Sequence, residues 1–231
     1  MGDVTLTSGR GPLGHNPGGR FSAPLPEGVV YVEPFRRRVR GVAAGETVVD
    51  SERVLLVHRA GGPPFYVFPA DDVHGAVSEA EPDAPDYVRV AWDAVDAWYE
   101  EDEQVFLHPR NPYHRIDCVR TSRHLHVEVA GEVLVDRTGT IVLYETALEP
   151  RLYVGRDAVR MDLLVPSPTT TYCPYKGTAS HWNAVIGDTV VEDIAWSYED
   201  PLPESSAIRG LLSFYDTKAA VVHDVPPAAE L

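Results

Sequence analysis

The chain has 231 residues, a formal net charge of −15 at pH 7, 44% hydrophobic residues and 24% charged residues. The length allows one large or two small domains, and the composition is typical of a globular fold. The acidic charge argues against a nucleic-acid partner, which needs a basic face, and against an anionic membrane surface. No apolar run approaches the roughly 18 residues of a membrane span, no apolar signal segment begins the chain, and its two cysteines make no disulfide framework. We therefore expect a cytoplasmic protein.

Short strands separated by turns dominate the sequence. The segment 1–27 is rich in glycine and proline without periodicity, so we expect a flexible leader there and a frayed tail at 225–231. From Val29 on, valine-rich runs between turn residues predict β-strands. Hairpin turns are predicted at Gly45-Glu46 and at Gly187-Asp188. The pattern indicates a mainly β protein of antiparallel sheets.

Two segments predict short helices. Residues 156–164 have apolar side chains spaced for one or two helical turns. Pro203 suits the first turn of a second helix, which we expect to end near Gly210. We expect few other helices.

An internal repeat appears when the chain is shifted by 86 residues. Ala44-Gly45-Glu46 then matches Ala130-Gly131-Glu132, and Val49-Asp50 matches Val135-Asp136. Later matches in the same frame are Pro64 with Pro150, Asp71 with Asp157, and Val73 with Val159. The alternative is a chance likeness of two unrelated β segments that share turn residues. We predict a tandem duplication, with a degenerate first copy at 28–118 and a second copy at 119–224.

The tryptophans offer a link between the later parts of the two copies. Residues 98–102, WYEED, resemble residues 196–200, WSYED. This match predicts that the first copy is shorter by about one hairpin and lacks the run Cys173-Pro174-Tyr175-Lys176-Gly177. Only the second copy can then carry the chemistry of that run.

This run contains one of the two cysteines and one of the two lysines, in a chain that otherwise uses arginine eighteen times. Such a lysine suggests that a compact amine, able to lose its proton when desolvated, is needed. Cys173 is a candidate nucleophile activated by Lys176, or a buried residue before a turn-forming proline. Lys176 is a candidate to bind an anion, to form a Schiff base, or to pair with Glu145 or Asp157.

Two acids are candidate proton carriers beside this run. Asp157 recurs as Asp71 in the copy that lacks the run, which favours a structural role such as a charge at a helix N-terminus. Glu145 is replaced by Arg59 in the first copy and so occurs only together with the run. That association makes Glu145 the stronger site candidate.

Aromatic side chains are dense in the second copy. Aromatic walls with a few polar groups are typical of small-molecule pockets, although β-sheet cores also favour aromatic residues. The ligand-binding candidates are Tyr153, Arg156, Tyr175, His181, Trp182, Trp196 and Tyr198.

Four histidines near the middle of the chain suggest a zinc site. Zinc ligands are usually paired at short spacing and include cysteine, whereas only Cys118 lies near His108, His114, His124 and His126. We therefore expect no metal and no cofactor.

Five separated blocks carry a family resemblance. In chain order they are residues 156–164, 173–180, 195–198, 208–210 and 214–215. Together they resemble the domain of unknown function 427, and residues 111–117 at the junction are similar to those of its two-domain members. The resemblance covers residues 30–224 and implies an all-β domain of two antiparallel sheets meeting at an angle, similar to the β-tent folds. The chain departs from the family pattern at His181, where tyrosine is typical, and at Val154-Gly155, where an aromatic residue and proline are typical; the first copy has Phe68-Pro69 there.

These observations favour a small-molecule-binding protein. Its pocket in the second copy would be walled by Tyr153, Tyr175, Trp182 and Tyr198, with Lys176 facing an anionic or carbonyl group. One alternative is an enzyme that uses Cys173 or Lys176 covalently, with Glu145 or Asp157 as proton carrier, and another is a non-catalytic scaffold. We expect an unknown small molecule as partner, and a monomer or a weak homodimer.

Overall fold

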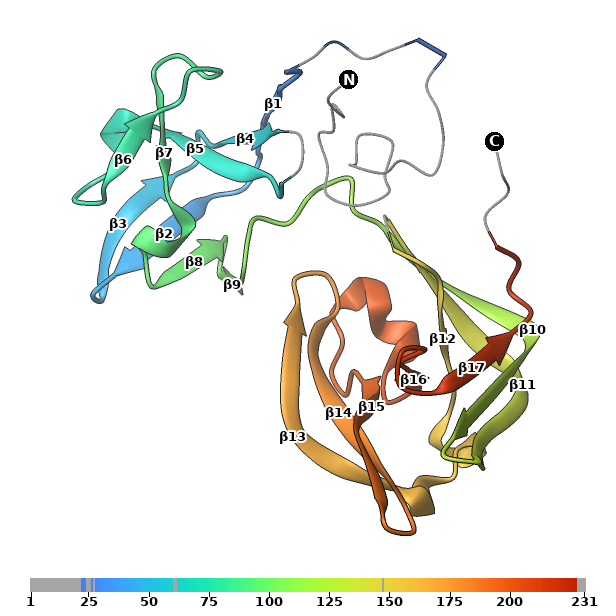
Figure 1. Ribbon diagram of the computed structural model, residues 1–231. Coiled ribbons are helices and arrows are strands. Elements are labelled where there is room, and N and C mark those ends of the chain that lie inside the picture. Colours follow the sequence, from blue (N-terminus) through green and yellow to red (C-terminus); the bar gives the residue numbers. More distant parts are fainter. Residues whose placement is uncertain (1–21, 24–25, 27, 60–61, 147, 228–231) are drawn as a thin grey trace. The chain divides into compact units, whose positions relative to one another are not determined.

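The computed structural model describes residues 22–23, 26, 28–59, 62–146 and 148–227. The protein is mainly β, its strands pair in antiparallel fashion, and the described helices are short 3₁₀ turns (Figure 1). No helix among these residues is long and apolar enough to cross a membrane. Most of the expected leader at 1–27, and part of the expected tail at 225–231, lie outside the described residues.

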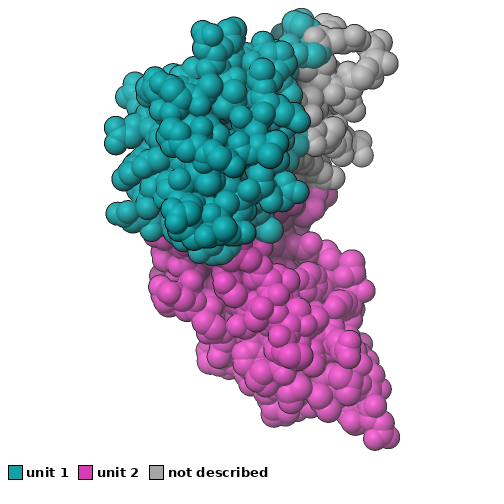
Figure 2. All heavy atoms as spheres, turned by 90° about the vertical axis from the view of Figure 1, so that its left-hand side faces the viewer, with its two compact units in different colours: residues 1–114, 231 teal, residues 115–230 magenta. Residues whose placement is uncertain are grey.

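The chain divides between His114 and Arg115 into two compact units, called unit 1 and unit 2 (Figure 2). The boundary expected after residue 118 falls inside strand β10, Ile116–Val129. The division precedes this strand because its first residues already pair with β11, Glu132–Glu145.

Unit 1 contains two sheets, in the orders β1-β4-β5-β7-β6 and β3-β2-β8-β9. Short 3₁₀ helices follow β5 and β7 along the chain. The elements are β1 (Tyr31–Pro34), β2 (Val39–Ala43), β3 (Glu46–Ser51), β4 (Leu55–His58), β5 (Phe65–Pro69), η1 (Ala70–Asp72), β6 (Ser78–Ala80), β7 (Tyr87–Val90), η2 (Trp92–Ala94), β8 (Ala97–Glu100) and β9 (Glu103–Val105).

Unit 2 also contains two sheets, in the orders β12-β11-β10-β17 and β13-β14-β15-β16. We call them the first and second sheets of unit 2. After β10 and β11 the elements are β12 (Arg151–Tyr153), η3 (Arg156–Ala158), η4 (Met161–Leu163), β13 (Leu164–Cys173), β14 (Gly177–Ile186), β15 (Thr189–Ser197), η5 (Pro203–Ile208), β16 (Leu212–Phe214) and β17 (Ala220–His223).

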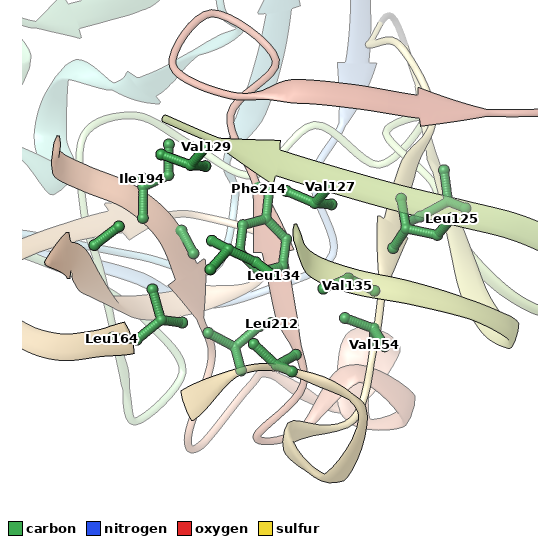
Figure 3. Close-up of a cluster of buried hydrophobic side chains, with 14 of the residues drawn as sticks. Leu125, Val127, Val129, Leu134, Val135, Val154, Leu164, Ile194, Leu212 and Phe214 are labelled. Carbon is green, nitrogen blue, oxygen red and sulfur yellow. The ribbon is translucent and has the colours of Figure 1, made fainter. Parts of the chain in front are cut away.

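The core of unit 2 lies between its two sheets (Figure 3). Along β10, Leu125, Val127 and Val129 are buried while the residues between them are not, because successive side chains of a strand point to opposite faces. They meet Ile194 of β15 and Phe214 of β16 in one apolar cluster. This cluster joins the sheets by hydrophobic burial.

The predicted turns and helices differ from the structure in detail. The first hairpin turn is Ala44-Gly45, one residue earlier than expected, and both residues have positive φ, as a tight hairpin turn requires. The turn at Gly187-Asp188 is confirmed between β14 and β15. The segment 156–164 forms two 3₁₀ helices rather than one helix, because Val159 is extended and pairs with Val135. The helix predicted after Pro203 is the 3₁₀ helix η5.

Residue pairs of unit 1 recur in unit 2 at a shift of 86. All four pairs of β1 with β4 and all five pairs of β2 with β3 reappear between β10 and β11. The three pairs of β4 with β5 reappear between β11 and β12. The bridge from Val49 to Val73 reappears from Val135 to Val159, and η1 reappears as η3. Two short strands of unit 1 thus correspond to each long strand of unit 2.

The predicted match of Trp98 with Trp196 is wrong. Strand β8, which carries Trp98, pairs with β2 in the same register in which β17 pairs with β10. The position of Trp196 in β15 is instead held by Glu79 in β6, since β6 pairs with β7 as β15 pairs with β16. Residues 160–194, with β13, β14 and the start of β15, are replaced in unit 1 by residues 74–77. The short WYEED similarity misled because it follows composition rather than strand position.

Candidate functional site

The run Cys173–Gly177 forms the tip of the hairpin between β13 and β14. Cys173 pairs with Gly177, and the amide of Lys176 donates to the carbonyl of Cys173 at 3.2 Å. Gly177 has a φ of +91°, a conformation that a residue with a side chain rarely adopts. The amide of Leu202 donates to the carbonyl of Lys176 at 3.1 Å and fixes the tip against the loop before η5. The backbone therefore holds the Lys176 side chain in one direction.

Lys176 forms a buried ion pair with Glu145. Its Nζ contacts Oε2 of Glu145, and the side chains are only 9% and 5% exposed. Glu145 ends β11 in the first sheet, whereas Lys176 lies at a hairpin tip of the second sheet. The pair therefore ties the two sheets together. Among the partners that the sequence suggested for Lys176, the structure brings Glu145 to it.

Both cysteines are half-buried free thiols in unit 2. Burial raises the pKa of the Cys118 thiol, the charge of Asp117 raises it further, and the charge of Lys176 lowers it. Cys118 packs against the aromatic cluster that contains Tyr153. Cys173 also lies close enough for its charge, when ionised, to raise the pKa of Tyr153.

Cys118 is expected to react with iodoacetamide only at a higher pH than an ordinary thiol does. The reason is that the thiolate is the reactive form and that burial raises the pKa of the Cys118 thiol. The measurement is the pH profile of alkylation in a Cys173→Ser variant, with the same chain in urea as the reference. A native profile that coincides with the urea profile would contradict the expectation.

Three of the predicted aromatic residues are buried together. Tyr153, Trp196 and Tyr198 are each less than 9% exposed and belong to one apolar cluster. Nε1 of Trp196 donates to the Tyr153 hydroxyl at 2.9 Å, which links β15 of the second sheet to β12 of the first. Burial raises the pKa values of Tyr153 and Tyr198, so both phenols stay neutral.

The other aromatic and basic candidates do not form one wall with these residues. Tyr175 is partly buried against the same cluster, but Trp182 packs against the core between the sheets. The guanidinium of Arg156 lies 4.9 Å from the centre of a Trp182 ring, and it also pairs with Glu199. His181 is buried, its Nε2 lies 3.4 Å from the Tyr215 hydroxyl, and its Nδ1 has no hydrogen-bond partner among the described residues.

An open cavity of about 580 Å³ lies at the middle of the first sheet of unit 2. We call it the threonine cavity. It is lined by residues of β10, β11, β12, η3 and the segment around η5, among them Arg120, Thr121, Arg137, Thr140, Tyr153 and Asp157. Tyr153 belongs both to this lining and to the buried aromatic cluster. Two of the predicted site residues, Tyr153 and Asp157, therefore lie at the cavity, whereas Lys176 and Cys173 are not among its lining residues.

Small side chains open this cavity in unit 2. Thr121 and Thr140 pair with each other in the strand register, and the residues at the same positions in unit 1 are Phe35 and Val54. Both of those residues are buried in the apolar core of unit 1. Where unit 1 has a filled core, unit 2 has threonines and a cavity. Neither threonine was predicted as a site residue, because a threonine in a β-strand is unremarkable by itself.

The polar groups of the threonine cavity favour an anion. Thr140 is only 4% exposed, and its Oγ1 has no hydrogen-bond partner among the described residues. Arg120 has no carboxylate partner among the described residues, and Arg137 lies 3.8 Å from the exposed carboxylate of Asp157. Guanidinium groups bind carboxylates and phosphates in bidentate fashion. Two arginines and one acid give this lining a positive balance in a chain of net charge −15.

The histidines of the junction do not gather into a metal site. His124 contacts Asp136, and His126 lies 3.9 Å from Glu128. Within the described part of the chain, no group of three or more His, Cys, Asp or Glu side chains is placed to hold a metal ion.

Comparison with known proteins identifies one family. The family model described as a domain of unknown function (DUF427) matches residues 117–225, which lie within unit 2. A search of curated proteins found no match. The two-domain membership suggested by the junction residues stays a prediction. Residues 117–225 of the C-terminal unit therefore match the DUF427 family.

Proposed function

We propose that unit 2 binds a small anionic molecule in the threonine cavity. The molecule carries a phosphate or carboxylate group for Arg120 and Arg137, and a polar atom that reaches Thr140. The observation that carries the proposal is the buried Oγ1 of Thr140, which has no partner among the described residues. A buried hydroxyl without a partner costs about 1–3 kcal/mol. Valine, which stands at this position in unit 1, would avoid that cost.

Binding is better supported than covalent catalysis by the predicted residues. A Schiff base forms only where a carbonyl substrate can reach the lysine nitrogen. The Nζ of Lys176 contacts Glu145 and its side chain is only 9% exposed, so a substrate has little access to it. Asp157, the other proposed proton carrier, is exposed and lies nearest to Arg137. We therefore assign Lys176 and Glu145 to holding the hairpin, and the binding role to the cavity.

We also propose that unit 1 is a shortened copy of unit 2. Support comes from the residue pairs that recur at a shift of 86 in three pairs of strands. Loss of β13 and β14 would remove the hairpin tip together with its lysine. Unit 1 has Arg59 at the position of Glu145, which fits that loss because an acid there would have no such lysine to pair with.

The acidic charge and the two free thiols support a cytoplasmic location.

Glycerol 3-phosphate is a suitable probe because it carries one phosphate and two hydroxyls. We expect calorimetric titration of the full chain to detect binding, and the double variant Arg120→Gln, Arg137→Gln to weaken it at least tenfold, since a hydrogen bond to a charged group contributes about 1.5–3 kcal/mol. Arg115→Gln is the matched control. Arg115 is an exposed arginine of unit 2 that pairs with Asp117 and does not line the cavity.

Thr140→Val separates binding from stability. Removing a hydroxyl without a partner should leave the free protein as stable or more stable, while it weakens binding of the probe. If Thr140→Val destabilises the free protein and leaves the affinity unchanged, the hydroxyl is structural and the proposal fails. Malate in place of glycerol 3-phosphate tests whether a carboxylate serves as well as a phosphate.

A further inference from the structure

Unit 1 contains a cavity of about 290 Å³ at the position of another cavity of unit 2. The shared positions follow from the strand registers. Tyr66 corresponds to Leu152, Arg89 to Ser213 and Trp98 to Val221, and all six residues line their respective cavities. We call the one in unit 1 the aromatic cavity. At these three positions unit 2 has two aliphatic residues and a serine, so the two rings and the guanidinium contributed there are particular to unit 1.

Aromatic rings form the deep part of the aromatic cavity. The ring of Trp98 lies 5.5 Å from that of Trp92 in a stacked arrangement and 5.8 Å from that of Tyr66. Nε1 of Trp98 donates to the carbonyl of Trp92 at 2.9 Å, and the Tyr66 hydroxyl donates to Glu100 at 2.5 Å. Tyr66 and Trp98 are each only 2% exposed, so the half-buried Trp92 offers most of the ring surface to a ligand. Aromatic and apolar walls are typical of pockets for small molecules.

Arginine forms the cationic part of the lining. The guanidinium carbons of Arg89 and Arg59 lie 4.1 Å and 5.3 Å from the centre of the Phe65 ring. Arg59 is neutralised by Glu81 and Asp83. Arg89 is exposed and has no carboxylate partner among the described residues. A guanidinium stacked on a ring and lacking a carboxylate is positioned to bind an anion from outside.

A strained turn forms part of the cavity wall. The amide of His108 donates to the carbonyl of Phe106 at 2.9 Å, which makes Leu107, with a φ of +71°, the centre of a γ-turn. This form of the γ-turn is rare and strained for a residue with a side chain. Leu107, which is 61% exposed, is one of the lining residues of the cavity. Backbone strain of this kind clusters at ligand sites.

We propose that the aromatic cavity of unit 1 binds a small aromatic carboxylate, with the ring against Trp92 and Trp98 and the carboxylate on Arg89. The volume suits one ring with a short acidic side chain rather than a larger cofactor. This site is separate from the threonine cavity and does not depend on the function proposed for unit 2.

Phenylacetate is the probe, and 2-phenylethanol is its neutral control of similar size. The four tryptophans of the chain give four indole N–H signals, two from each unit. We expect phenylacetate to shift the signals of Trp92 and Trp98 and to leave those of Trp182 and Trp196 unchanged. Assignment by single Trp→Phe variants makes the observation specific to the site.

Arg89→Gln is expected to weaken phenylacetate binding about tenfold and to leave the weak binding of 2-phenylethanol unchanged, because only the acid loses a charged partner. Arg36→Gln is the matched control, since Arg36 is an exposed arginine of unit 1 that does not line the cavity. Leu107→Gly relieves the turn and should weaken binding without lowering the stability of unit 1. Equal affinity for acid and alcohol, an unchanged affinity in Arg89→Gln, or shifts confined to Trp182 and Trp196 would each overturn the proposal.

Discussion

Replacing Lys176 with methionine is expected to lower the free energy of unfolding of unit 2 by about 3–5 kcal/mol. The reason is the carboxylate of Glu145, which is 5% exposed and would remain buried without its cation. Removing one partner of a buried ion pair is expensive even where the pair itself adds little stability. The measurement is urea denaturation followed by hydrogen exchange of peptides from β11 and β14.

The other lysine supplies the control for this variant. Lys218 is exposed and donates to the carbonyl of Glu192 at 2.9 Å, so Lys218→Met should change stability by no more than about 0.5 kcal/mol. The double variant Lys176→Met, Glu145→Leu should regain most of the loss, because it leaves no unpaired charge. A loss below about 1 kcal/mol in Lys176→Met would show that Glu145 finds another partner or solvent.

The same variants address the chemistry of Lys176. If Lys176 has only the structural role argued above, the double variant should bind glycerol 3-phosphate as the natural chain does. Loss of binding in a stably folded double variant would instead mean that Lys176 takes part in ligand binding.

Replacing Trp196 with alanine is the second substitution with a large expected effect, again about 3–5 kcal/mol in unit 2. Trp196 is 8% exposed and packs with Tyr153, Tyr198 and Tyr215. Its truncation removes a large buried ring and also the donor to the Tyr153 hydroxyl. The measurement is the free energy of unfolding from urea titration, with hydrogen exchange of β12 and β15 as the local readout.

Tyr153→Phe isolates the hydrogen bond from the packing. It keeps the ring and leaves the indole N–H of Trp196 without its acceptor, so we expect a loss of about 1–3 kcal/mol. Combined with Trp196→Phe, which keeps an aromatic ring but has no N–H, it forms a double-mutant cycle whose coupling measures the contact. Additive effects would mean that the contact between the sheets contributes nothing beyond burial.

The two variants probe a common arrangement. The Lys176–Glu145 pair and the Trp196–Tyr153 hydrogen bond both run between the first and second sheets of unit 2. The backbone pair of Val154 with Leu212 is a further connection between these sheets. Tyr153, which is also among the lining residues of the threonine cavity, is held by the hydrogen bond from Trp196. A rigid wall favours binding because less order has to be imposed when the ligand arrives.

The class of fold and much of the local structure could be predicted from the residue pattern. Valine-rich runs and turn residues predicted a mainly β chain, since strand preference and turn geometry depend on neighbouring residues. The shift of 86 residues was readable because turn glycines such as Gly45 and Gly131 keep positive φ values. Lys176 stood out because the chain has only two lysines. Glu145 stood out as its partner because the first copy lacks both the lysine run and this glutamate.

Which of these residues come together in a site depends on the three-dimensional packing. Burial of Lys176 by Glu145, and the separation of Trp182 from Tyr153, depend on how two sheets pack, which no local pattern encodes. The match of Trp98 with Trp196 failed for the same reason, because strand partners are set by long-range pairing. Thr140 and Arg89 became site residues through what surrounds them in space: a hydroxyl or guanidinium gains a binding role only where the fold leaves it without an internal partner.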